Sequence, residues 1–335
     1  MIGFNYFTEA IYLPEEWDNL AENYFQHKAF LIHTENHNPC HQRYFTVIEN
    51  GRIVAGAVVY SLRLDLLTYL KIKSPVKMKI VGIPCSVSSA GVFGDMGAVD
   101  LLKEHIYKKE KGFVLMLNLK DKTLNNNGAS GSTLPTIVLH NKFRSWEHYL
   151  GSLKSDYRRR LKKITEGITE TNFIKSSCAD FTPEMYRQYL EVLKRSKGKL
   201  ESLSFSFFKN LPVDFILTQY RKYDKLLGWN IAVESNKTYY FFLGGVDYKR
   251  NKKNNTYLSL LARIVKDGIE LGVEKIDLGQ TAEIPKMRLG GRATELFMEA
   301  RHSNNTFNFL LKRFGKSMEY KFVSENPHPF KTKRQ

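Results

Sequence analysis

Residues 239–291 read YYFFLGGVDYKRNKKNNTYLSLLARIVKDGIELGVEKIDLGQTAEIPKMRLGG, and the rest of the chain is interpreted around them. Tyr239–Val246 is aromatic and apolar and too short for a helix, so it predicts a strand. Gly244–Gly245 within this run predicts a kink or bulge. Lys249–Asn255 is polar and basic, and it predicts a loop.

Apolar residues then recur at helical spacing over Leu258–Leu271, and Gly272 follows in the position of a helix C-cap. Val273–Leu278 predicts a second short strand, which carries Asp277. A closing loop follows, with three polar or cationic residues: Gln280, Lys286 and Arg288.

A strand, a cationic loop, a helix and a second strand together can hold an anion. The start of the helix offers free N–H groups and a partial positive charge, and the loop adds lysines and arginines. The same pattern also fits an ordinary strand–helix–strand unit with a solvated loop.

The length of the chain indicates the number of domains, and its net charge indicates the kind of partner. The chain has 335 residues, which predicts two domains, and 51 Lys and Arg against 34 Asp and Glu give a net charge of +17. A surplus this large suggests an anionic partner, which could be a nucleic acid, a phosphorylated cofactor, an acidic carrier protein or an anionic membrane surface.

The cysteine pattern and the N-terminal composition predict a cytoplasmic protein. Three scattered cysteines form neither a disulfide framework nor a zinc pattern. The N-terminus has no signal-peptide pattern, and no apolar run approaches membrane-spanning length. We expect no metal site, because Pro39 interrupts the helix that would align His33, His37 and His41.

Outside the central stretch, the Asn50-Gly51 pair between two strand-like runs predicts a β-hairpin over residues 44–60. Phe215–Tyr223 predicts a helix. Small residues and glycines in Val81–Asp95 suit either a substrate-lining loop or a simple connection between strands.

Ser145–Ile164 predicts one continuous helix with an apolar stripe and many cations between the apolar residues. Such a face can grip phosphates or an RNA backbone, although many basic faces are only solvated. Three consecutive arginines, Arg158–Arg160, favour the binding role.

Three segments resemble FemAB-like and CelD-like members of the GNAT acyltransferase superfamily. They are SLKSDYRRRLKKI at 152–164, YFFLGGVDYKRNKKNNTYLSLLARIVKDGIELG at 240–272 and IDLGQTAEIPKMRLGG at 276–291. The resemblance covers the second half well and the first half only in its α/β order.

The resemblance implies an α/β fold of mixed, twisted sheets flanked by helices, as two tandem GNAT-like domains. We expect an N-terminal domain at 1–140 and a C-terminal acyltransferase domain at 141–335 that ends in a basic tail. It also implies acyl transfer to an amine. The donor would be acyl-CoA, a phosphopantetheine thioester on an acidic acyl carrier protein, or an aminoacyl-tRNA, with no tightly bound cofactor.

This sequence departs from the usual GNAT pattern before the central helix. That loop is normally glycine-rich, so that backbone amides can approach a pyrophosphate, whereas Lys249–Thr256 contains no glycine. Either side-chain cations take over this role or the donor is not free CoA.

Acyl transfer needs a base for the amine, donors for the developing oxyanion and a cationic environment for the leaving group. Strand-end carboxylates and nearby tyrosines are the catalytic candidates: Asp247, Asp277 and Tyr257. The oxyanion candidates are Gly245 and Val246. The substrate-binding candidates are Gln280, Lys286, Arg288 and Tyr157. The donor or phosphate candidates are Arg158, Arg159, Lys162, Lys249 and Arg250.

Three functions remain open from the sequence. The first is an N-acyltransferase that uses acyl-CoA or an acyl carrier protein and acts on a small amine, amino sugar or amino acid. The second is an aminoacyl-tRNA-dependent transferase of the cell-envelope type. The third is a non-catalytic module that binds nucleic acid or an anionic membrane through the basic face.

Overall fold

The structure is a computed structural model, and it describes residues 2–65, 75–85, 87–122, 128–165, 171–196, 201–315, 319–321, 325 and 327–331. The chain forms two compact units. Unit 1 comprises residues 1–135, 200–207 and 295–322, and unit 2 comprises residues 136–199, 208–294 and 323–335. The predicted domains are contiguous, with a boundary at residue 140, whereas both units are built from separate stretches of chain.

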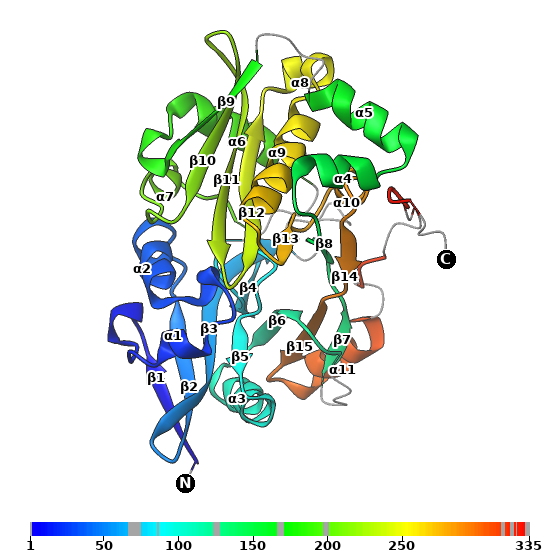
Figure 1. Cartoon of the computed structure of the whole chain (residues 1–335). Helices are drawn as coiled ribbons and strands as arrows, with labels where there is room; N and C mark the ends of the chain where they lie inside the picture. Colours follow the sequence, from blue (N-terminus) through cyan, green and yellow to red (C-terminus); the bar gives the residue numbers. More distant parts are fainter. Residues whose placement is uncertain are drawn as a thin grey trace. The chain divides into compact units, whose positions relative to one another are not determined.

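Unit 1 contains a mixed sheet in the order β1-β2-β3-β4-β6-β15-β7, with β5 paired to β3 (Figure 1). Its strands are β1 Ile2–Phe7, β2 Arg43–Glu49, β3 Arg52–Asp65, β4 Pro75–Val81, β5 Val92–Gly94, β6 Phe113–Leu119, β7 Ala129–Ser132 and β15 Phe297–His302. Its α-helices are α1 Trp17–Leu20, α2 Lys28–His37, α3 Met96–Lys109 and α11 Asn305–Phe314, and the short 3-10 turns are Ala10–Tyr12 and Tyr24–Gln26. Helix α7, Phe205–Lys209, spans the division between the units.

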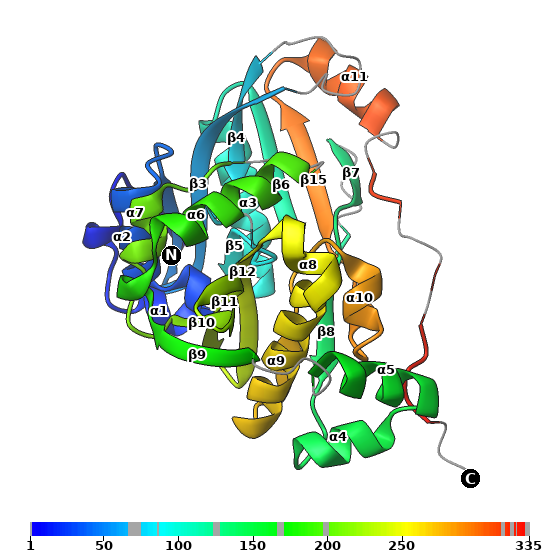
Figure 2. The same ribbon diagram turned by 90° about the horizontal axis from the view of Figure 1, so that it is seen from above.

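Unit 2 contains a second mixed sheet, in the order β14-β8-β13-β12-β11-β10-β9 (Figure 1), and Figure 2 shows β8 to β12 from above. Its strands are β8 Thr136–His140, β9 Thr171–Ser177, β10 Ile216–Lys222, β11 Lys225–Ser235, β12 Thr238–Val246, β13 Lys275–Asp277 and β14 Arg292–Thr294. Its helices are α4 Trp146–Ser152, α5 Ser155–Thr165, α6 Pro183–Arg195, α8 Tyr248–Asn254, α9 Thr256–Glu270 and α10 Glu283–Met287, with a 3-10 turn at Cys178–Asp180.

The two sheets share one layout. Each has four antiparallel strands, then a single parallel pair, then two further antiparallel strands. The parallel pair is β4–β6 in unit 1 and β12–β13 in unit 2. The next strand comes from a distant part of the chain in both cases, β15 beside β6 and β8 beside β13. Unit 1 is discontinuous in sequence because β15 and residues 200–207 return to it, and the same two stretches divide unit 2.

The central helix of unit 2 is confirmed as predicted. Helix α9 buries an apolar face against the sheet, with Leu261, Ile264 and Val265 almost fully buried. Gly272 has φ +70, and its N–H donates to Ile269 O while the next N–H, of Val273, donates to Gly268 O. This is a Schellman C-cap, and it ends the helix at the predicted glycine.

The hairpin prediction is also confirmed. Strands β2 and β3 pair antiparallel, and the turn residues Asn50 and Gly51 have φ values of 51° and 80°. Positive φ at both positions gives the turn whose twist matches the flanking strands.

Two predictions around the central stretch are wrong. The predicted loop Lys249–Asn255 is mostly helix α8, because the Asp247 side chain accepts the Lys249 N–H and caps a new helix there. The irregularity in β12 is not at Gly244–Gly245. Leu243 lies opposite Ile231 and Phe241 opposite Ala232, so Phe242 is the extra residue.

The predicted continuous helix Ser145–Ile164 is also wrong, since it is broken between α4 and α5. The C-terminal tail makes the backbone contacts at the break: Leu153 bridges Phe330, and the Lys154 N–H donates to Pro329 O at 2.8 Å. A segment distant in sequence therefore ends a helix that the local pattern would continue.

Phe215–Tyr223 is strand β10 rather than a helix, because it is paired on both sides, with β9 and β11. Val81–Asp95 connects β4 to α3 and contributes β5. Tertiary pairing therefore decides the structure of both segments.

All three cysteines are buried free thiols. In the described part of the chain, no group of three or more His, Cys, Asp and Glu could hold a metal ion. The His33 and His37 rings lie one turn apart on α2 and are tilted relative to each other, with ring centroids 4.8 Å apart. No helix among the described residues combines the length and apolar character needed to cross a membrane.

Candidate functional site

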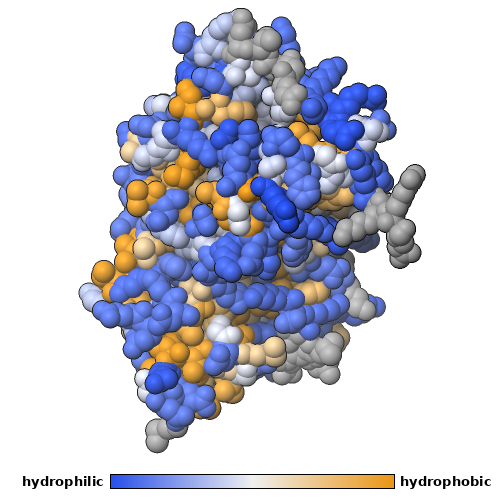
Figure 3. All heavy atoms as spheres, in the orientation of Figure 1, coloured by the Kyte–Doolittle hydropathy of each residue, from blue (hydrophilic) through white to orange (hydrophobic). Residues whose placement is uncertain are grey.

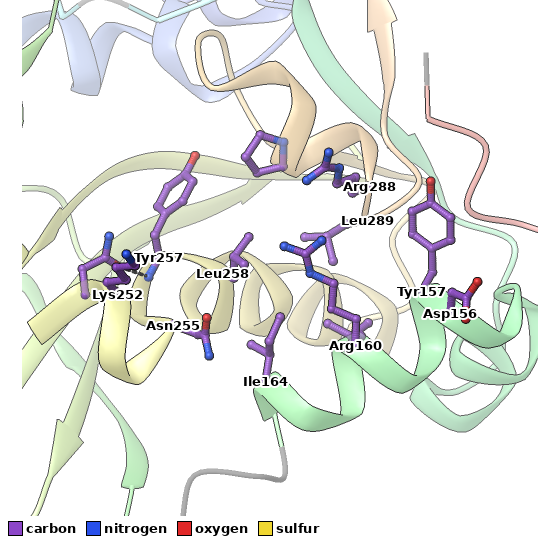
Figure 4. Close-up of a pocket in the computed structure, with 13 residues that line it drawn as sticks. Asp156, Tyr157, Arg160, Ile164, Lys252, Asn255, Tyr257, Leu258, Arg288 and Leu289 are labelled. Carbon is purple, nitrogen blue, oxygen red and sulfur yellow. Dashed lines mark hydrogen bonds between the residues drawn. The ribbon is translucent and has the colours of Figure 1, made fainter. Parts of the chain in front are cut away.

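A cavity of about 560 Å³ lies within unit 2, between α5, the α8–α9 junction and α10 (Figure 4). Its lining combines cationic, amide and apolar side chains. The lining residues are Asp156, Tyr157, Arg160, Leu161, Ile164, Asn251, Lys252, Asn255, Tyr257, Leu258, Pro285, Arg288 and Leu289.

The start of α9 forms one wall of this cavity. Asn255 adopts a left-handed conformation with φ 48°, which turns the chain sharply from α8 into α9. The Asn251 side chain accepts the Tyr257 N–H at 3.0 Å. The first turn of a helix carries a partial positive charge, so this wall favours an anionic group.

Three cations from different elements reach this cavity. Arg160 belongs to α5, Lys252 to α8, and Arg288 immediately follows α10. Figure 4 shows the Arg160 and Arg288 side chains extending into the same space. Arg288 also lies 3.8 Å from the Glu325 carboxylate. A planar guanidinium suits phosphate and carboxylate oxygens, so these side chains can bind an anionic group.

The remaining wall is apolar. Leu161, Ile164, Leu258 and Leu289 provide aliphatic surface beside the cations. Burial raises the pKa of the Tyr257 phenol, which keeps this hydroxyl protonated. The cavity therefore offers a charged end and an apolar end to one ligand.

A second polar cluster lies where β12 and β13 separate. The two strands pair only from Thr238 opposite Lys275 to Tyr240 opposite Asp277, while β12 continues to Val246. The Asp277 carboxylate accepts the Thr136 hydroxyl at 2.6 Å and the Gly279 N–H at 2.7 Å. These bonds fix the turn that follows β13.

Lys286, on α10, is the third polar residue of this cluster. Its side chain is almost fully buried, and its Nζ donates to the carbonyl oxygens of Gly279 at 3.0 Å and Gln280 at 2.6 Å. Burial lowers the pKa of Lys286 to about 7, although Asp277 and Glu283 act in the opposite direction. A buried amine that titrates near neutral pH can exchange a proton with a substrate.

The structure brings some predicted residues together and separates others. Tyr157, Tyr257 and Arg288 line the cavity. Asp277, Lys286 and the Gln280 backbone meet in the second cluster. Each predicted role remains a prediction.

Asp247 does not line the cavity. Its carboxylate caps α8 and pairs with Arg250 at 2.5 Å. Gly245 and Val246 lie in regular pairing with β11. A β-carbon on Gly245 would lie 2.5 Å from Trp229 Nε1, so this position requires glycine for packing.

The predicted donor residues on α5 and α8 surround the cavity but do not line it. Arg158, Arg159 and Lys162 lie on α5, whose outer surface is strongly hydrophilic (Figure 3). Arg159 pairs with Asp156 at 3.0 Å, with both side chains exposed. Lys249 lies in the first turn of α8.

Five polar lining residues were not among the predicted site residues: Asp156, Arg160, Asn251, Lys252 and Asn255. All of them lie beside predicted residues, within the same basic segments. The helical periodicity of α5 could have identified its lining residues, because only one face of α5 reaches the cavity. The inner side of the α8–α9 turn supplies the others.

Comparison with known proteins identifies one domain. Residues 151–287 match the family model of the acetyltransferase (GNAT) domain. This range includes Lys286 and most of the cavity lining, and it ends before Arg288 and Leu289. No curated protein matches this sequence.

Solved structures share the fold. The structure of L-PGS from Bacillus licheniformis matches with a TM-score of 0.51 and 10% identity, over 83% of this chain and 88% of that chain. A tandem GNAT protein from the clavulanic acid biosynthesis pathway matches with a TM-score of 0.50 and 10% identity, over 91% and 99%. A structure of FemX matches with a TM-score of 0.48 and 10% identity, over 78% and 88%.

Residues 151–287 therefore form a GNAT acetyltransferase domain, so the protein is an acyltransferase, with an α/β fold of two mixed sheets. A tandem GNAT protein shares the fold over 91% of this chain.

Proposed function

We propose that this protein is an N-acyltransferase that takes an acyl group from a phosphorylated thioester, acyl-CoA or acyl-phosphopantetheine, and transfers it to the amine of a small acceptor. The observation that carries this proposal is the unit 2 cavity, which combines Arg160, Lys252 and Arg288 with the start of α9 and an apolar wall. A phosphate bound to an apolar arm matches that combination.

In this proposal the cations of the cavity hold the donor phosphates. They replace the glycine-rich loop that the sequence lacks before α9. Salt screens exposed ion pairs but not contacts to the apolar wall, so donor affinity should fall only moderately with ionic strength.

Lys286 acts as the base for the attacking amine. The amine nitrogen forms a bond to the thioester carbonyl carbon, the C–S bond breaks, and the thiol leaves. Lys286 in its neutral form accepts the proton lost by the amine and returns it to the thiolate. Asp277 acts as a positioning residue, because it fixes the Gly279 turn whose carbonyl oxygen binds the Lys286 Nζ.

A second candidate is transfer from an aminoacyl-tRNA. The exposed or half-buried cations of α5 and α8 favour it: Arg158, Arg159, Lys162, Lys163, Lys249 and Lys253. Phosphate contacts supply most of the affinity for a nucleic acid and make it strongly dependent on salt. An acidic acyl carrier protein would use the same surface for the first candidate.

Calorimetric titration with CoA, acetyl-CoA, longer acyl-CoAs, acyl carrier protein and bulk tRNA at 50 and 300 mM salt tests the proposal. We expect saturable thioester binding at both salt concentrations. The variants Arg160→Ala and Arg288→Ala should each weaken it about tenfold, which corresponds to about 1.4 kcal/mol. Arg158→Ala is the matched control on the same helix, and it should change thioester binding less than twofold.

Thiol release from the bound acyl donor in the presence of a panel of amines then tests the reaction itself. Binding of tRNA with a steep salt slope, without thioester binding, would reject the first candidate in favour of the second. Binding of neither donor would reject both.

A further inference from the structure

Helix α11 of unit 1 presents large apolar side chains to solvent. Phe307 is 57% exposed, Phe309 65% and Leu310 43%. The helix already has an inward contact, since Leu311 packs against the cluster of Met78, Phe113 and Ala300. Other residues of α11 attach it to β15 and β7, so the exposed apolar side chains are not needed for that packing (Figure 1).

The charge on this helix has a single sign. The sequence from Arg301 to Gly315 contains no Asp or Glu. Lys312 and Arg313 are exposed in the last turn. They follow Phe309 by three and four residues, so all three side chains lie on one side of the helix.

The exposed apolar residues of the N-terminal segment lack this combination. Ile2 and Tyr6 on β1 and the neighbouring Ile11 and Tyr12 are also exposed. Their segment carries Glu9 and then Glu15-Glu16, which an anionic surface would repel. Within the described residues, α11 thus joins exposed aromatic residues to positive charge on one helix face.

We propose that α11 docks the protein on an anionic lipid bilayer. Phe309 and Leu310 would enter the boundary between headgroups and acyl chains, while Lys312 and Arg313 contact the headgroup phosphates. Aromatic side chains favour this boundary, and the net charge of +17 adds long-range attraction. The inference does not depend on the proposed function, because it concerns unit 1 and a different ligand.

Vesicle flotation of the full chain tests this docking. Vesicles of phosphatidylcholine alone are compared with vesicles that contain one third phosphatidylglycerol. We expect binding to the anionic vesicles at least tenfold stronger than to the neutral ones. The double variant Phe309→Ser/Leu310→Ser should lose at least tenfold in affinity for the anionic vesicles. It should keep the wild-type circular dichroism spectrum, since both side chains are exposed.

Two controls separate the helix from nonspecific adhesion. Val213→Ser/Tyr223→Ser removes comparably exposed apolar side chains elsewhere and should bind as wild type. The Phe309→Trp variant places a tryptophan on the docking face, and its emission should shift to the blue with anionic vesicles only. The three natural tryptophans are buried and provide the background.

Wild-type binding by the Phe309→Ser/Leu310→Ser variant would overturn the proposal. So would a loss of vesicle binding caused by Arg158→Glu/Lys162→Glu on α5 while the α11 variant still binds. Sedimentation of the wild type as a dimer that dissociates in the α11 variant would assign this face to a second copy of the chain instead.

Discussion

The ring of Phe330 packs so tightly on Gly290 that a β-carbon at Gly290 would lie 2.3 Å from Phe330 Cζ. Gly290 also has φ +94, a conformation that favours glycine. The Phe330 ring also makes a tilted contact with Phe143 and an edge-on contact with Tyr149 in the core of unit 2. The C-terminal tail is thus anchored just after Arg288, a lining residue of the cavity.

Gly290→Ala should therefore destabilise unit 2 by about 2 kcal/mol or more, because the added methyl must displace Phe330 and the backbone is strained. Urea denaturation followed by tryptophan fluorescence measures this change. Gly151→Ala is the matched control: it lies on α4, meets no atom within 4 Å, and should stay within about 1 kcal/mol of wild type. Equal stability of the two variants would contradict the anchoring role of Phe330.

One donor molecule should bind per chain, although the two sheets share a layout. In unit 1 the space beyond the parallel pair β4–β6 is filled by the connection that follows β4. Asn118 Nδ2 donates to Val87 O at 2.8 Å, and Gly82 bridges Ala90. A β-carbon on Gly91 would lie 2.1 Å from Gly82 N, so this connection is closely packed.

Calorimetric titration with whichever thioester donor binds measures the number of donor molecules per chain directly. We expect a value near one per chain, abolished together with binding in Arg160→Ala/Arg288→Ala. A second binding event that survives this double variant would place a donor site in unit 1.

The sequence predicted the elements whose signals are local. The Asn50-Gly51 hairpin and the Gly272 stop of α9 both depend on residues within the element itself, and both are confirmed. The basic segments around the cavity were also recognised, but Arg158 and Arg159 were chosen where Arg160 lines the cavity. Arg159 and Arg160 are adjacent in sequence but point to different sides of α5. Because the helix restarts at Ser155 after the break at Leu153, the side that faces the cavity could not be read from one continuous helix.

Features that depend on distant partners were not predictable. The break between α4 and α5 is set by Pro329 and Phe330, more than a hundred residues further along the chain. The return of β15 to the sheet of unit 1 likewise has no local signature. The buried Lys286 was predicted to bind substrate, whereas its low pKa follows from packing that only the fold defines.

The three cysteine thiols should react slowly in the folded protein. Burial raises the pKa of Cys40 and of Cys178 to about 12, and it raises that of Cys85 as well. Since the thiolate is the reactive form, little of it is present at pH 8. We expect fewer than one thiol per chain to react with Ellman's reagent within minutes, and three after unfolding in guanidinium. Rapid reaction of a single thiol in the native protein would instead indicate an accessible, activated cysteine.

Replacement of Lys286 should separate its role in the reaction from its effect on stability. The folded chain lowers the pKa of Lys286 from 10.5 to about 7, so the unfolded chain binds more protons between these values. The contribution of Lys286 to the free energy of unfolding therefore increases as the pH rises from about 7 to 10.5. Lys286→Met should lack this contribution, so the difference in stability between wild type and variant should change between pH 7 and pH 9 in favour of wild type.

Catalysis should respond in a different way. With an aromatic amine acceptor that stays neutral above pH 6, wild-type kcat/KM should rise with pH and level off above about 7, as Lys286 loses its proton. Lys286→Met should lower kcat at least a hundredfold, remove this pH dependence and leave the donor Kd within about threefold. Lys286→Arg should not restore the rate, because a guanidinium stays protonated. A wild-type pH profile in Lys286→Met would show that the base is another group.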